Sequence, residues 1–106
     1  MRSHSDIQRI KYKANFNLIM DQETAIMKRF LRKLLNLNIW GGRHTELTNL
    51  LKCLPKHLRG TKEAKSALQK LVKMEYILPK LSTGEKHLSL NAHKQKEIYD
   101  FVSDDA

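Results

Sequence analysis

Cysteine and long apolar runs are both scarce in this 106-residue sequence. The single cysteine, Cys53, excludes an intramolecular disulfide framework and favours a reducing, intracellular compartment. No apolar run is long enough for a secretory signal peptide or for a membrane-spanning helix. We therefore expect a soluble, cytoplasmic protein in which Cys53, set between Leu51 and Leu54, belongs to the apolar packing.

Motifs for catalysis or metal binding are also missing. The four glycines form no phosphate-binding loop, and the sequence contains neither a G-x-S-x-G motif nor a pair of acids with a plausible pocket. We expect no catalytic residues and no cofactor, and hence no enzyme. Metal binding is poorly supported, because Cys53 has no partner and the histidines lack the spacing of a structural zinc site. The five histidines are His4, His44, His57, His87 and His93.

Acidic residues are scarce relative to basic ones. Eleven Asp and Glu stand against 20 Lys and Arg, which gives a net charge of +9 and an isoelectric point near 9.9. Residues 52–73 contain seven basic residues and one acid, whereas residues 28–43 contain five basic residues and no acid. This distribution favours a polyanionic partner and places the expected binding face in the middle of the chain. A Lys-rich surface that serves only solubility is the alternative interpretation.

The N-terminal residues 1–20 predict a basic arm or a strand. Apolar and polar residues alternate over 10–18, as in a half-buried strand, and a short helix that begins after Ser5 competes with it. The remainder, residues 21–106, is expected to form one domain, because 41% hydrophobic residues suffice for one small core.

The first clear helix is predicted over about 22–38, with Asp21 as its N-cap and Gly41-Gly42 at its end. Trp40 lies just before these glycines and is interpreted as a core anchor rather than as a platform for a nucleic-acid base. The apolar stripe of this helix contains Ile26, Met27, Phe30, Leu31, Leu34 and Leu37.

Two further helices are predicted in the basic middle of the chain. The second covers about 44–53 and ends before Pro55, because proline cannot continue a helix. A short connector follows, in which Leu58 is the apolar plug. Thr61 then caps a third helix over about 62–75, whose apolar residues recur at helical spacing and whose opposite face is basic.

After the third helix the apolar period switches from 3.6 to 2, which predicts a β-hairpin. If Thr83-Gly84 are the central turn residues, Pro79 pairs with Leu88 and Ile77 with Leu90. A last helix is predicted over about 92–102, capped by Asn91. The other face of the hairpin, turned to solvent or to a ligand, would carry Lys80, Ser82, Glu85 and His87.

The order helix, helix, turn, basic helix, hairpin resembles a winged helix-turn-helix domain over about residues 22–102. The sharpest local match is ALQKLVKMEYI, residues 67–77, which looks like a recognition helix entering the first wing strand in small prokaryotic and archaeal regulators. The resemblance implies a mainly α fold with a small β-hairpin (α+β), in which a three-helix core carries a wing and a C-terminal helix. Glu75 departs from the family pattern, which often has glycine there.

By this resemblance the protein would bind double-stranded DNA and regulate transcription, with the third helix in the major groove and the hairpin on the adjacent backbone. Lysines would contact phosphates, whereas Gln69 and Ser66 are able to read base edges. The candidate nucleic-acid-binding residues are Arg43, Arg59, Thr61, Lys62, Lys65, Ser66, Gln69, Lys70, Lys73, Lys80, Lys86 and His87.

Two other classes of function stay open at the level of sequence. A basic winged helix is also able to dock on structured RNA, which a preference for A-form duplex or single strands would reveal. The domain is alternatively a protein-interaction module of a larger transcription or processing complex. A homodimer through the C-terminal helix or the N-terminal segment is a further expectation, although packing of that helix within its own chain ranks first.

Overall fold

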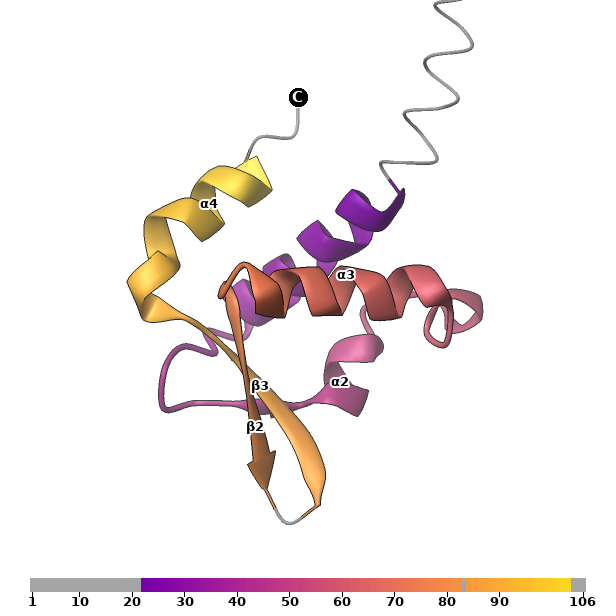
Figure 1. The fold of residues 1–106 in the computed structure, drawn as a ribbon, viewed down its shortest axis with the longest axis horizontal. Helices are drawn as coiled ribbons and strands as arrows, with labels where there is room; N and C mark the ends of the chain where they lie inside the picture. Colours follow the sequence, from indigo (N-terminus) through magenta and orange to yellow (C-terminus); the bar gives the residue numbers. More distant parts are fainter. Residues whose placement is uncertain (1–21, 83, 104–106) are drawn as a thin grey trace, which may run out of the picture.

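The computed structural model describes residues 22–82 and 84–103, which form a mixed α+β arrangement (Figure 1). The first helix, drawn in indigo, covers residues 22–36. The other elements are β1 (Thr45–Glu46), α2 (Leu47–Leu51), the 3-10 helix η1 (Lys56–Leu58), α3 (Lys62–Lys73), β2 (Ile77–Ser82), β3 (Glu85–Leu90), the 3-10 helix η2 (Ala92–Lys94) and α4 (Gln95–Ser103). The predictions for residues 1–20 and for Asp21 lie outside the described residues.

The first helix ends earlier than predicted, and Asn38 rather than Gly41-Gly42 ends it. The backbone of Asn38 adopts the left-handed conformation, with φ 56°, and its N–H donates to Leu35 O at 3.0 Å. The N–H of Ile39 donates to Leu34 O at 3.0 Å, which completes a Schellman motif with asparagine at C′. Leu37 therefore lies beyond the helix and is 36% exposed, whereas the other residues of the predicted stripe are buried.

The predicted second helix over 44–53 is wrong in its first turn. Thr45 and Glu46 form β1, which pairs antiparallel with Leu88 and His87 of β3. The helix begins only at Leu47 and has five residues. Pairing with the exposed edge of β3 satisfies backbone groups at 45–46 that a short helix would leave without partners.

The third helix has the predicted N-terminus, because Thr61 Oγ1 accepts a hydrogen bond from Ala64 N at 3.2 Å. It ends at Lys73, two residues earlier than predicted, in a second Schellman motif. The backbone of Glu75 adopts the left-handed conformation in this motif, with φ 65°. Glu75 thus occupies the position and the conformation in which glycine is usually found. The side-chain amide of Asn91 donates to Glu75 O at 2.8 Å and holds this turn.

The sheet has the order β1-β3-β2, and the β2–β3 register is the predicted one. Ile77 is paired with Leu90 and Pro79 with Leu88, which places these residues on one face of the hairpin. Ile77, Leu88 and Leu90 on that face are fully buried in the core.

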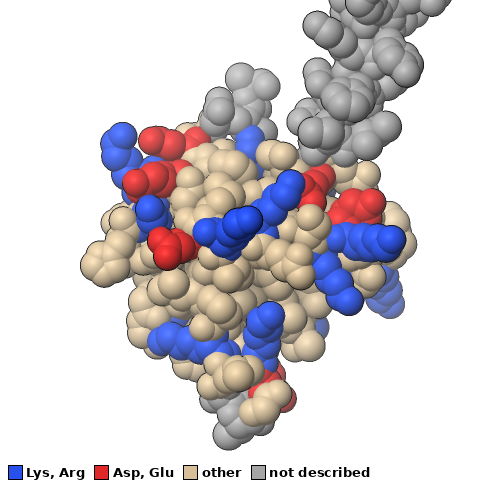
Figure 2. All heavy atoms as spheres, in the orientation of Figure 1, with Lys and Arg blue, Asp and Glu red and all other residues tan. Residues whose placement is uncertain are grey.

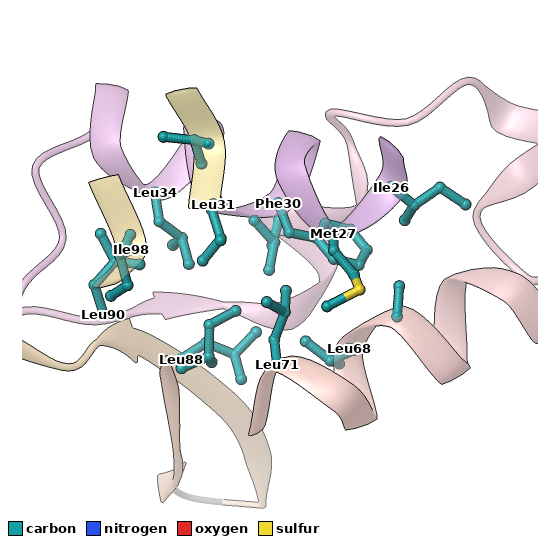
Figure 3. Packing of buried hydrophobic residues seen from close by; sticks show 14 of the residues in the cluster. Ile26, Met27, Phe30, Leu31, Leu34, Leu68, Leu71, Leu88, Leu90 and Ile98 are labelled. Atoms are coloured by element: carbon teal, nitrogen blue, oxygen red, sulfur yellow. The ribbon is translucent and has the colours of Figure 1, made fainter. Parts of the chain in front are cut away.

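The core lies between the first helix, α3, the sheet and α4, as Figure 3 shows. Trp40 is half-buried against this core, with its ring 6.1 Å from that of Tyr99, in agreement with the interpretation as a core anchor. Cys53 is half-buried against it as well, and burial raises the pKa of its thiol. None of the described helices is long and apolar enough to cross a membrane.

Candidate nucleic-acid interface

The exposed face of α3 carries a stripe of three lysines and one glutamine. Lys62, Lys65, Gln69 and Lys73 are all exposed, and they share one face because an α-helix has 3.6 residues per turn. The opposite face, which includes Ala64, Ala67 and Leu71, is buried in the core. In Figure 2 the Lys and Arg side chains spread along α3 and down onto the hairpin, and several acidic side chains lie toward α4.

A groove separates this stripe from the hairpin. Its volume is about 220 Å³, and it is lined by Leu68, Gln69, Val72, Lys73, Pro79 and Lys86. Lys86 lies on the same face of β3 as Leu88, but closer to the hairpin tip, so its exposed side chain is beside α3 rather than in the core. The groove therefore brings one cation of the hairpin next to Gln69 and Lys73 of the helix.

Two other predicted contacts on α3, Ser66 and Lys70, are turned toward the first helix. The carboxylate of Glu23 accepts hydrogen bonds from Lys70 and Ser66, and these bonds lower the pKa of Glu23. Ser66 and Lys70 therefore lie beside the stripe, and the positive charge of Lys70 is already paired with Glu23.

Arg59 and Thr61 bond to the backbone of the connector between α2 and α3. Arg59 Nε donates to Leu54 O at 2.8 Å, and its guanidinium also donates to Lys52 O at 3.4 Å. The Thr61 hydroxyl donates to Leu58 O at 2.8 Å while it caps the helix. These hydrogen bonds fix the conformation of the connector that leads into α3. Arg43 is exposed in the loop that precedes β1.

Lys80 and His87 lie on the other face of the hairpin. They are directly paired across β2 and β3, on the face opposite to Lys86. His87 is half-buried there, with its Nδ1 at 2.8 Å from Nδ1 of His44 and its Nε2 at 3.8 Å from Oε1 of Glu85. The structure thus divides the predicted hairpin contacts between two faces, and only Lys86 is on the side of α3.

A group of potential metal ligands that the sequence spacing did not reveal surrounds His87. Glu46 faces Glu85 so closely that a hydrogen bond between their carboxyl groups, together with their like charge, raises the pKa of Glu85. One ligand atom from each of Glu46, Glu85 and His87 lies within 4.8 Å of the others. The signal in the sequence is two pairs of residues at i, i+2 spacing, His44 with Glu46 and Glu85 with His87, and it is readable only once residues 45–46 are known to be a strand.

The chain matches no family model, no curated protein and no solved structure.

Proposed function

We propose that this chain is a winged helix-turn-helix protein that binds double-stranded DNA as a transcription regulator, with α3 in the major groove and the β2–β3 hairpin on the adjacent backbone. The observation that carries the proposal is the alignment of the α3 stripe with Lys86 across one groove. The order of elements supports it, because a short helix and connector precede α3 and a hairpin follows directly.

The chemistry of the stripe suits a duplex. Lys62, Lys65 and Lys73 surround Gln69, so that ammonium groups are placed to contact phosphates on both sides of a side chain that reads bases. The amide of glutamine is able to pair with N6 and N7 of adenine in the major groove. Sequence preference would therefore come mainly from Gln69, and affinity mainly from the lysines.

The shape of the stripe favours DNA over RNA. An exposed helix of about 10–12 Å diameter fits the B-form major groove, which is about 12 Å wide. The major groove of A-form RNA is deep and narrow and does not admit a helix in this way.

The test is fluorescence anisotropy of labelled duplex DNA with single-alanine variants that each remove one positive charge. Lys65→Ala, Lys73→Ala and Lys86→Ala are expected to weaken binding several-fold, because each removes a phosphate contact from the same face. Lys70→Ala and Lys80→Ala are the charge-matched controls, since Lys70 is paired with Glu23 and Lys80 lies on the opposite hairpin face.

The pattern among these variants decides the outcome. Equal loss in all five variants would indicate a diffuse charge effect and would contradict a defined face. Tighter binding to A-form RNA than to DNA would favour the RNA alternative, and weak binding that is indifferent to Lys65 and Gln69 would favour a protein partner. Gln69→Ala is expected to flatten the preference among duplex sequences by about 1–3 kcal/mol at the contacted base pair.

A further inference from the structure

Two pairs of potential metal ligands meet where β1 joins the hairpin. His44, in the loop directly before β1, is two residues from Glu46 of β1, and Glu85 and His87 are two residues apart along β3. Side chains at this spacing point to the same face of a sheet. Because Glu46 is paired with His87, both pairs lie together on the face opposite to the buried Leu88 and Leu90.

The distances are close to those of a metal centre. One ligand atom from each of Glu46, Glu85 and His87 lies within 4.8 Å of the other two, and Nε2 of His87 is 3.8 Å from Oε1 of Glu85. Zinc binds nitrogen and carboxylate oxygen at about 2.0–2.2 Å, so tetrahedral ligand atoms lie roughly 3.3 Å apart. Both glutamates are exposed, and small rotations of their side chains would close the remaining gap.

The second histidine gives an independent indication. Nδ1 of His44 is 2.8 Å from Nδ1 of His87, a distance at which one nitrogen carries the proton and the other accepts it. When His87 is the donor, its Nε2 is unprotonated and presents a lone pair toward Glu85. Metal-ligating histidines are held in this way, by an acceptor on the other ring nitrogen.

We propose that Glu46, Glu85 and His87 bind one divalent cation of the zinc type, and that His44 is a positioning residue that selects the tautomer of His87. A pocket of about 230 Å³ opens beside the two glutamates of the site and is lined by Glu46, Leu47, Thr48, Glu85 and Lys86. A cation here would also link β1 to the hairpin, because Glu46 belongs to β1 and the other two ligands belong to β3. The proposal is independent of DNA binding.

Two lysines neighbour this site, and their charge is expected to weaken the binding of a cation. Lys86 belongs to the other face of the hairpin but also lines the pocket beside Glu85, and Lys80 is paired with His87 on the face of the site. Both side chains are exposed and weaken cation binding by like-charge repulsion. We therefore expect an affinity below that of closed four-residue zinc sites.

The test is calorimetric titration of the chelator-treated 106-residue chain with zinc chloride. One zinc per chain is expected, and His87→Ala, His87→Gln and Glu46→Gln are each expected to weaken binding by about tenfold or more. His57→Ala and His93→Ala, which remove exposed histidines elsewhere, are the matched controls and should leave binding unchanged. Magnesium should not compete, because it prefers an all-oxygen ligand set.

Nitrogen NMR of the histidine rings tests the role of His44. Zinc should shift the Nε2 resonance of His87, and His44→Ala should alter the tautomer of His87 before any zinc is added. The proposal is overturned if zinc binding survives both His87 variants and Glu46→Gln, or if it depends on His4, His57 or His93. Circular dichroism of each metal-free variant separates loss of the site from loss of the fold, and the His87→Gln variant retains a polar side chain at that position.

Discussion

At the scale of single residues, the backbone at the end of α3 is strained at one position. Glu75 has φ 65°, a left-handed conformation that costs a residue with a Cβ about 1–2 kcal/mol. Glu75→Gly is therefore expected to raise the free energy of unfolding by about 1 kcal/mol, part of the gain being offset by the greater freedom of glycine in the unfolded chain. Urea unfolding measures this change.

Asn38 is the matched control for this prediction. It occupies the same place in the other Schellman motif, with φ 56°, but asparagine tolerates left-handed geometry better than glutamate does. Asn38→Gly should consequently give a smaller gain, and Glu75→Ala should give none. A Glu75→Gly variant that is no more stable than the original chain would contradict the assignment of strain to this residue.

At the scale of secondary-structure elements, Glu23 connects the first helix to α3. Hydrogen bonds from Lys70 and Ser66 lower its pKa below the ordinary value of 4.5, so its contribution to stability is present above that pH. The contribution is lost as the pH falls through the lowered pKa of the folded state. Because Lys70 is exposed and Glu23 is only half-buried, we expect this contribution to be less than about 1 kcal/mol.

The Glu23→Gln variant tests the contribution of these contacts between the first helix and α3. The variant should be less stable than the original chain at pH 7, and the difference should disappear well below pH 4.5, where the carboxyl group is protonated in both folded and unfolded states. Chemical denaturation at the two pH values measures it, and a high-salt series should also reduce the difference. A difference that persists unchanged in acid would show that Glu23 acts through packing instead of charge.

At the scale of the whole molecule, the net charge of +9 governs how a polyanion approaches the chain. If four lysines (Lys62, Lys65, Lys73 and Lys86) each neutralise one phosphate, the logarithm of the DNA association constant should fall against the logarithm of salt with a slope of about −4. Each alanine variant at these four positions should reduce the slope by about 1. A much steeper slope would mean that additional cations, such as Arg43, also reach the phosphates.

The candidate site was predictable from the sequence to the extent that it depends on one helix. Lys62, Lys65, Gln69 and Lys73 share a face because of the helical period alone. The pairing of Lys70 with Glu23 was not predictable, because the two residues are 47 positions apart and meet only through packing. Lys86 and His87 are neighbours in sequence, yet the hairpin places them on opposite faces and gives them different surroundings.

The sequence by itself determined the basic third helix with its Thr61 cap, the hairpin register and the apolar stripe of the first helix, since each is set by local period, capping or turn chemistry. Only the tertiary structure decided that residues 45–46 form a strand, because two residues carry no periodic signal and their hydrogen bonds go to β3, about forty residues later. That long-range pairing also brings Glu46 to His87. The proposed cation site therefore depends on the part of the fold that local propensity could not specify.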